Sequence, residues 1–583
     1  MAPDPAGRGS RPRVPSAKMP GRAIAGAGLA LSLAVFGIAL LGRLSYPLLW
    51  QDEGETAVFA RRVLEYGYPK VHGTRNVVYE FGFDVARGID ERFDAYIGTT
   101  WGHFYFAAPA VALADRTGDL RTRTALMRLP FALAGAAGVG VALAGLLPAV
   151  RSRGARLSLA SAHFLLATVC VALLLHLREV RYYALVTLLS SSLFAVHAWH
   201  FAYRRIGLRA WSLSTALLLF LLYQTFYVGF FVFLGALALD RLAASRERPP
   251  QSRAAVLVRE LAPLVVTALA AAPFVLFFEQ IETARAFAAR FQLGPADYAR
   301  NAIAILRYLV RYELLVPAIG LAAVGLALAR LPAPARLEPR DVAAPARRFL
   351  AILLTLNALV NAANPVLYGR YLAVLSPLLI ALVLLQLIRL GRWAASPAAR
   401  GASPALRAGL ALLTVGLLAA GILPKAPEVA GRLRELRDPV RGPLDFAIPF
   451  LAKRYREPRR LVIATNYESF PLMAYLGSHV IVGLSGANLA RDRTLRPDVV
   501  IPRKTWPQHI DVLAGFLREG DFERHVLPVM DAPYNTIPEL GRWPTVPLTH
   551  PFETRIPRSE RESLELFVRV DASAARADPR EAP

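Results

Sequence analysis

The chain has 583 residues, a formal net charge of +25 and 55% hydrophobic residues, with a mean hydropathy of +0.38. This apolar content exceeds the roughly 45–50% of soluble globular proteins, so composition argues against an ordinary soluble fold. The single cysteine, Cys170, excludes a disulfide framework within the chain.

The apolar residues form runs of roughly 16–25 residues, long enough to cross about 30 Å of hydrocarbon as a helix. Residues 1–22 are rich in Pro, Gly and Arg, and we expect a disordered N-terminus. A retained first span follows at 23–49, because the run is too long for a signal peptide. The later candidate spans are 128–150, 157–177, 182–203, 211–223, 226–242, 258–278, 314–329, 349–362, 371–388 and 408–423.

The segment 211–239 is too long for one pass and short for two full ones at about 1.5 Å per residue. Arginines concentrate in 151–156, 204–209, 240–253, 330–348 and 389–407. These loops share one side of the membrane only if 211–239 makes two passes. The positive-inside rule then places the N-terminus in the cytoplasm and explains the net charge without nucleic acid.

The first exterior loop, 50–127, opens with the most informative segment of the chain. Asp52, Glu53 and Glu55 directly follow the first span, and 56–66 has the pattern of an amphipathic helix lying along the membrane interface. The acids suit chemistry at the membrane surface, but they equally suit a solvated cap that complements the dipole of the helix.

Two exterior links between spans carry arginines against the positive-inside trend. The first contains Arg178, Arg181 and Tyr182, and the second contains Arg370 and Tyr371. A planar guanidinium is suited to gripping a phosphate, although headgroup anchoring or a local ion pair is an alternative reading of each link. Carboxylates and arginines at one membrane face would suit group transfer from a membrane-anchored phosphate.

The tail from about 426 to 583 is polar and Pro-rich. Short β-like runs at 461–465, 480–483, 498–501 and 564–570, with a helical stretch at 469–476, predict a small α/β domain. The odd number of spans places this domain outside the membrane. No catalytic motif is evident in it.

The order of these motifs resembles GT-C-fold glycosyltransferases of the protein-mannosyltransferase and aminoarabinose-transferase type, labelled glycosyltransferase family 39 or RgtA/B/C/D-like in bacteria. The matching segments are 52–55, 101–109, 128–131, 178–183 and 370–372. The resemblance covers roughly the first 430 residues. It departs from the family pattern at 101–106, Trp-Gly-His-Phe-Tyr-Phe, and at 223–226, Tyr-Gln-Thr-Phe.

The resemblance implies a polytopic α-helical membrane protein with about eleven to thirteen spans in residues 23–425 and an exterior, periplasmic α/β domain in 426–583. It implies transfer of a sugar from a polyprenyl-phosphate donor to an exterior acceptor: a lipid, glycan or protein. The membrane would be the inner cell membrane.

The resemblance also implies roles for single residues. Asp52 would be the catalytic carboxylate, with Glu53 second. Arg178, Arg181, Tyr182, Arg370 and Tyr371 would contact the donor phosphate. Glu55, Asp84, Asp94 and His103 are secondary candidates. Relatives engage a divalent metal such as Mg²⁺ or Mn²⁺, and Asp52 is the candidate ligand, but one acidic pair is not a full ligand set.

Two other classes of function stay open at this point. A transporter or flippase of lipid-linked glycans would be expected to carry charges in the middle of its spans and broken helices in matched halves. A non-catalytic membrane scaffold would bind a partner through its tail and would not need Asp52.

Overall fold

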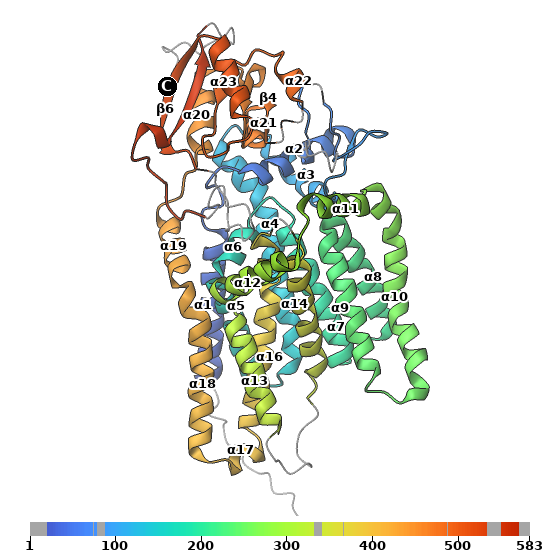
Figure 1. Cartoon of the computed structure of the whole chain (residues 1–583). Coiled ribbons are helices and arrows are strands. Elements are labelled where there is room, and N and C mark those ends of the chain that lie inside the picture. The colour runs from blue at the N-terminus through green and yellow to red at the C-terminus, as the bar shows by residue number, and fades with distance from the viewer. Residues whose placement is uncertain are drawn as a thin grey trace, which may run out of the picture.

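The computed structural model describes residues 20–570 except 74, 79–87, 331–340, 365–366, 485, 487 and 533–549. A long helical bundle carries a smaller α/β domain at one end (Figure 1). We call this end the domain end, and the opposite end, where α17 (Pro397–Gly401) lies, the far end.

The bundle contains seven described helices that are long and apolar enough to cross a membrane, or nine if each of two bent helix pairs forms one span. The seven are α1 (Pro20–Leu41), α4 (Leu120–Leu146), α7 (Tyr183–His197), α9 (Tyr227–Ser245), α10 (Pro250–Phe277), α16 (Ser376–Ala394) and α18 (Pro404–Ile422), which continues into α19 (Ala426–Arg437). The bent pairs are α5 (Arg153–Val169) with α6 (Val171–Leu177), and α12 (Pro295–Tyr312) with α13 (Leu315–Arg330). The chain is therefore a multi-pass membrane protein.

Two less apolar helices, α8 (Leu208–Thr225) and α14 (Ala344–Ala362), lie alongside these spans (Figure 1). They add two to the nine, so each of the eleven predicted apolar runs corresponds to a helix or bent pair. The doubtful segment 211–239 forms two helices, α8 and α9, because the backbone of Phe226 is extended between them. The segment therefore contains two helices, as the prediction of two passes requires.

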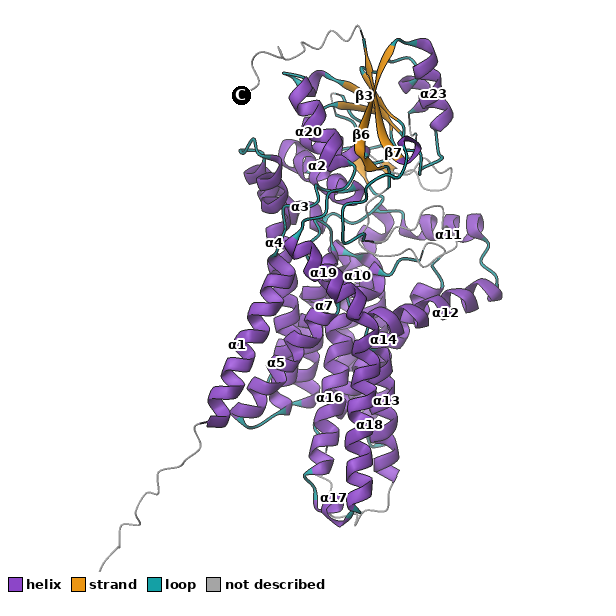
Figure 2. Cartoon of the chain, turned by 90° about the vertical axis from the view of Figure 1, so that its left-hand side faces the viewer, coloured by secondary structure: helices purple, strands orange, loops and turns teal. Residues whose placement is uncertain are grey.

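The segment 279–311, which lies between two predicted spans, is largely helical. It forms α11 (Gln280–Phe291) and α12, which run across the domain end of the bundle rather than along it (Figure 2). A bend of 91° separates α12 from α13. We attribute the transverse course of α12 to its amphipathic sequence, which suits a helix with one face on the bundle and the other towards lipid or water.

One group of buried charges inside the bundle lies near the far ends of the helices. Asp240 of α9 pairs with Arg241 and with Arg348 of α14 and lies 3.2 Å from His197 of α7, and Arg241 also pairs with Glu260 of α10. Each charge has a partner, which is what burial demands. Charges at helix ends do not form the mid-membrane path expected of a transporter.

The domain end carries a five-stranded sheet in the order β4-β3-β5-β7-β6. Strands β3 (Val462–Thr465), β4 (His479–Val482) and β5 (Val499–Ile501) are parallel, while β6 (Phe522–Met530) and β7 (Ser563–Arg569) are antiparallel. Helices α20 (Leu444–Arg454), α21 (Ser469–Leu476), α22 (Leu489–Asp492) and α23 (Ile510–Glu519) accompany the sheet. The predicted strands and the helix at 469–476 are confirmed; β6 and α23 were not predicted.

The α/β domain is attached to the bundle through α2 (Gln51–Tyr66), which lies between α21 and α3 (Gly102–Ala114) (Figure 1). The contact is close at Gly54, where an added Cβ would lie 2.6 Å from the nitrogen of Pro471. Asp445 of α20 accepts a hydrogen bond from the backbone of Leu48 at 3.0 Å and pairs with Arg121. Glycine at position 54 therefore lets the domain rest directly on the helix that carries the acidic residues.

Candidate functional site

Helix α2 begins at Gln51, five residues before the predicted start at Thr56. Asp52 and Glu53 therefore lie in its first turn, where carboxylates complement the helix dipole. The backbone N–H of Trp50 donates to Glu53 Oε2 at 3.4 Å, as at a helix N-terminus. Helix α2 runs across the domain end of the bundle (Figure 1), the direction expected of a helix along the membrane interface, but most of it is buried between α3 and the C-terminal domain.

Asp52 is the most accessible of the three carboxylates near the start of α2. Its side chain is 15% exposed, whereas those of Glu53 and Glu55 are fully buried. Asp52 Oδ2 accepts a hydrogen bond from Arg370 Nη1 at 2.8 Å, across 318 positions of sequence. The first exterior loop and the link before α16 therefore meet at one ion pair.

Arg181 also lies at Asp52, next to its backbone rather than its carboxylate. Its Nη1 donates to Glu55 Oε2 at 2.8 Å and to the backbone oxygen of Asp52 at 3.3 Å. Glu55 also accepts from the hydroxyl of Tyr96 at 3.3 Å. Glu55 thus fixes Arg181 beside the backbone of Asp52.

Three buried donors at this place make no hydrogen bond within the described part of the chain. They are Nε of Arg181, Nε of Arg370 and the hydroxyl of Tyr183. Although burial opposes the charge, Glu55 and Asp52 raise the pKa of Arg181, and Tyr183 and Asp52 raise the pKa of Arg370, so both stay charged. Unfilled donors on buried cations are costly, and a bound anion would satisfy them.

Aromatic rings surround the two arginines. Tyr182 stacks on Phe226 with ring centroids 4.9 Å apart, and Phe226 stacks in turn on Tyr371 at 6.0 Å. The guanidinium of Arg370 lies over the ring of Tyr368, 4.0 Å from its centroid. Such rings hold guanidinium groups in place and offer a low-dielectric wall to a ligand.

The C-terminal domain contributes Tyr467 to this site. Tyr467 follows β3, and its ring stacks on Trp506 at 4.6 Å. Burial and the carboxylates of Glu468 and Asp52 raise the pKa of Tyr467, so the phenol is neutral at pH 7 and lies within electrostatic reach of Asp52. Sequence reasoning missed Tyr467; its position after a parallel strand, where ligands bind in many α/β sheets, was the available signal.

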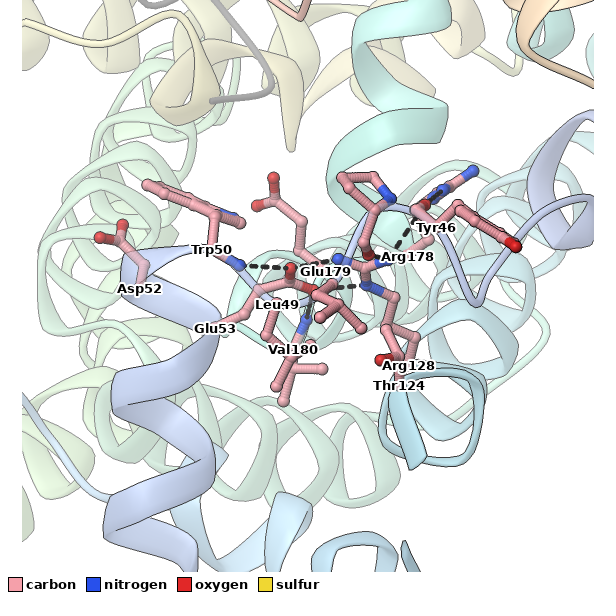
Figure 3. A network of polar contacts seen from close by, with 12 residues as sticks. Tyr46, Leu49, Trp50, Asp52, Glu53, Thr124, Arg128, Arg178, Glu179 and Val180 are labelled. Carbon is pink, nitrogen blue, oxygen red and sulfur yellow. Dashed lines mark hydrogen bonds and ion pairs between the residues drawn. The ribbon is translucent and has the colours of Figure 1, made fainter. Parts of the chain in front are cut away.

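Glu53 occupies a different environment from Asp52. It forms a buried ion pair with Arg128 of α4, and its Oε1 also accepts from the backbone of Val180 at 3.0 Å. Figure 3 shows Glu53 pointing towards Arg128 and Val180, while Asp52 points away from them. Arg128 further donates to backbone oxygens of Leu44, Tyr46 and Pro47, so this network fixes the link between α1 and α2.

Arg178 belongs to the same structural network rather than to the Asp52 pair. Its guanidinium donates to backbone oxygens of Gly42, Arg43 and Tyr46 and lies 4.0 Å from Glu435 (Figure 3). The structure therefore brings Arg181 and Arg370 to Asp52 and directs Arg178 to the backbone beneath.

The secondary candidates are placed as follows. Asp94 pairs with His72 at 2.6 Å within the first exterior loop, and Asp84 lies outside the described residues. His103 is fully buried with its ring 5.6 Å from that of Tyr182. Burial lowers the pKa of His103 and the charge of Arg181 lowers it further, so its imidazole is neutral at pH 7.

The carboxylates of α2 do not fit a divalent cation held by protein ligands alone. Asp52, Glu53 and Glu55 each pair with a different arginine. No three His, Cys, Asp or Glu side chains gather as a ligand set in the described ranges. The observed donor set matches an anion better than Mg²⁺ or Mn²⁺.

No family model matches the chain, and no curated protein matches it. Solved structures of ArnT from Cupriavidus metallidurans are similar to it. ArnT bound to undecaprenyl phosphate aligns with a TM-score of 0.52 and 13% identity over 95% of this chain and 99% of that chain. The apo state aligns with a TM-score of 0.47 and 13% identity over 93% and 97%. The chain therefore has the fold of ArnT, and the GT-C fold that its motifs predict is confirmed.

Proposed function

We propose that this protein is a membrane glycosyltransferase that moves a sugar from a polyprenyl-phosphate donor to an exterior acceptor. The observation that carries the proposal is that Arg370 and Arg181 both contact Asp52, the first at its carboxylate and the second at its backbone oxygen, and that each has an unfilled Nε donor. Two buried cations with spare donors beside a partly exposed carboxylate suit group transfer from phosphate.

Arg181 and Arg370 would bind the donor phosphate. Their unfilled donors and the hydroxyl of Tyr183 supply hydrogen bonds to phosphate oxygens, and Tyr182 and Tyr371 line the approach. The similar ArnT structure holds undecaprenyl phosphate, which supports a polyprenyl phosphate as the carrier.

Asp52 would act as the general base. The acceptor hydroxyl loses its proton to the Asp52 carboxylate as its oxygen forms a bond to the anomeric carbon. The bond from that carbon to the phosphate oxygen breaks, and its electron pair stays on the phosphate, which Arg370 and Arg181 stabilise. A single displacement of this kind inverts the anomeric carbon, as the family resemblance implies.

The buried acids would serve as positioning residues. Glu55 fixes Arg181, and Glu53 with Arg128 fixes the start of α2, so that Asp52 is presented towards Arg370. Contacts to the residues around a catalytic group hold that group in its productive geometry.

The orientation proposed for the chain places the domain end and the acceptor outside the cytoplasm. The arginine-rich segments 389–407 and 245–253 lie at the far end of the bundle (Figure 1), which the positive-inside rule assigns to the cytoplasm.

The test is incubation of purified protein with a panel of polyprenyl-phosphate sugars, followed by measurement of the released free lipid phosphate. We expect Asp52→Asn to lower release by about 10²–10⁴-fold, the usual contribution of a general base, while the protein stays folded. Glu65→Gln is the matched control, because Glu65 lies on α2 but is exposed. Full activity of Asp52→Asn would remove Asp52 from its role, and no release from any donor would refute the proposed reaction.

A further inference from the structure

Arg370 follows a short irregular link, residues 363–369, which we call the α14–α15 link. Helix α14 ends at Ala362, and the next helix, α15 (Arg370–Ala373), has only 4 residues. A helix of one turn is not stable alone, because closing its first turn fixes several residues for a single hydrogen bond. Contacts from other parts of the chain must therefore hold Arg370 where it meets Asp52 at 2.8 Å.

The start of the α14–α15 link is held by Asn301 of α12. The Nδ2 of Asn301 donates to the backbone oxygen of Ala362 at 3.0 Å and to that of Asn364 at 3.1 Å. Asn301 is buried. Ala362 is the last residue of α14, and the terminal carbonyls of a helix have no partner within that helix. Asn301 therefore caps α14 from another helix and determines where the link leaves it.

The same face of α12 covers α15. Ile305 and Tyr308 follow Asn301 at the i+4 and i+7 positions, which lie on one side of a helix. Both side chains belong to a buried apolar cluster that includes Leu372 of α15. Helix α12 therefore contacts the chain on both sides of Arg370, through hydrogen bonds before it and through apolar packing after it.

The C-terminal end of α12 is fixed to a membrane span. Lys425, which is buried between α18 and α19, donates from Nζ to the backbone oxygens of Glu313 and Gly421, each at 2.6 Å. The hydroxyl of Tyr308 donates to Glu313 Oε1 at 3.4 Å. A cation at the C-terminal ends of two helices satisfies their last carbonyls and complements their dipoles. Helix α12 is therefore a fixed support for the link.

We propose that Asn301 is a positioning residue, which determines where Arg370 lies. Its hydrogen bonds end on backbone oxygens of the α14–α15 link, so it acts on the donor phosphate through Arg370 and not by contact. Loss of these bonds would free the start of the link, and the guanidinium of Arg370 would no longer be held between Asp52 and the ring of Tyr368. The effect on turnover rests on the proposed function, whereas the effect on the link does not.

The first test replaces Asn301 with leucine, which is similar in size and cannot donate a hydrogen bond. Hydrogen–deuterium exchange of the detergent-solubilised full chain is followed in peptides that cover 367–375. We expect exchange there to become at least about tenfold faster, because two hydrogen bonds are lost, while exchange in α9 stays unchanged. Leu306→Ala is the control, because Leu306 lies on the exposed side of α12. Unchanged exchange in 367–375 would overturn the proposal.

A double-mutant cycle tests whether Asn301 acts through Arg370. We expect Asn301→Leu to raise KM for the lipid-phosphate sugar about tenfold in the otherwise unaltered protein. In an Arg370→Gln background the same change should raise KM less than about twofold, because the group that Asn301 positions is absent. Asn301→Gln, which keeps an amide donor, should recover part of the loss. An equal rise of KM in both backgrounds would overturn the assignment.

The two readouts separate this proposal from the proposed function. Faster exchange in the link without turnover of any donor would support the role of Asn301 and refute glycosyl transfer. Turnover with unchanged exchange would refute the role of Asn301 alone. If Asn301→Leu does not fold, both measurements use Asn301→Ser, whose hydroxyl can donate to only one of the two oxygens. Unchanged values for that variant would equally overturn the proposal.

Discussion

At the scale of single residues, neighbouring acids of α2 differ in what they contact. Asp52 is partly exposed and pairs with Arg370, while Glu53 is fully buried and pairs with Arg128. Sequence placed both in one catalytic pair, because adjacent carboxylates look alike in a sequence. On a helix, neighbouring side chains point about 100° apart, so only one of the two can face a given site.

Glu53→Gln should therefore act on stability. Neutralising one partner of a buried ion pair leaves Arg128 uncompensated and typically costs about 3–5 kcal/mol. We expect a lower melting temperature of the detergent-solubilised protein, measured by tryptophan fluorescence. Glu53→Gln/Arg128→Met, which removes both charges, should recover part of the loss. A Glu53→Gln protein of native stability but no activity would instead point to a chemical role.

Arg370→Lys should act on donor binding. Lysine keeps a charge beside Asp52 but lacks the planar fork and the Nε donor of arginine. We expect KM for the lipid-phosphate sugar to rise about tenfold, the effect of one charge-assisted hydrogen bond, with little change in melting temperature. Arg300→Lys, at an exposed position, is the control. An unchanged KM would show that Arg370 does not bind the donor phosphate.

Two arginines three residues apart, Arg178 and Arg181, were equally good phosphate ligands in the sequence. The link between α6 and α7 that carries them is not regular helix, so no periodicity indicates which way each points. Arg178 turns to the backbone at 42–46, and Arg181 turns to Asp52. The long-range partners of a buried charge cannot be read from local pattern.

At the scale of elements, apolar run length predicted the spans well, since lipid imposes one requirement on every crossing helix. The start of α2 and the transverse helices α11 and α12 were missed. Their sequences are mixed in polarity, and tertiary contacts rather than composition determine where they begin and lie. Apart from the glycine at position 54, nothing in the sequence indicated that α2 and α21 pack closely together.

Gly54→Ala should separate α2 from the C-terminal domain. The added methyl would lie 2.6–2.9 Å from backbone atoms of Phe470 and Pro471 and 2.7 Å from the Pro471 ring, and this overpacking typically costs about 1–3 kcal/mol. We expect lower thermal stability and lower activity together. Gly140→Ala in α4, where nothing lies within 4 Å of the new methyl, should be neutral or slightly stabilising. Equal stability of the two variants would contradict the close contact.

At the scale of the whole molecule, the positive-inside rule predicts on which side of the membrane each end of the bundle lies. The arginine-rich far end and the domain end are opposite in Figure 1. The single native cysteine, Cys170, is buried, so introduced cysteines can report the orientation of the chain.

Glu519→Cys and Ala395→Cys should differ in labelling. Glu519 is exposed on α23 of the C-terminal domain, and Ala395 is exposed beside α17 at the far end. A maleimide reagent that reaches the outer face of the inner membrane but cannot cross it should modify position 519 only. Position 395 should react only after the membrane is opened. The reverse pattern would invert the proposed topology and place the Asp52 site in the cytoplasm.

Helix α2 is shared by both halves of the molecule, since the bundle holds it through Arg128 and Arg370 and the sheet domain presses on it at Gly54. A shift of the sheet domain against the bundle would therefore be transmitted to Asp52 through α2. Exchanging the sheet domain between related chains would displace Asp52 unless the packing on α2 were kept. Such an exchange would have to keep glycine at position 54, where the domain packs directly on α2.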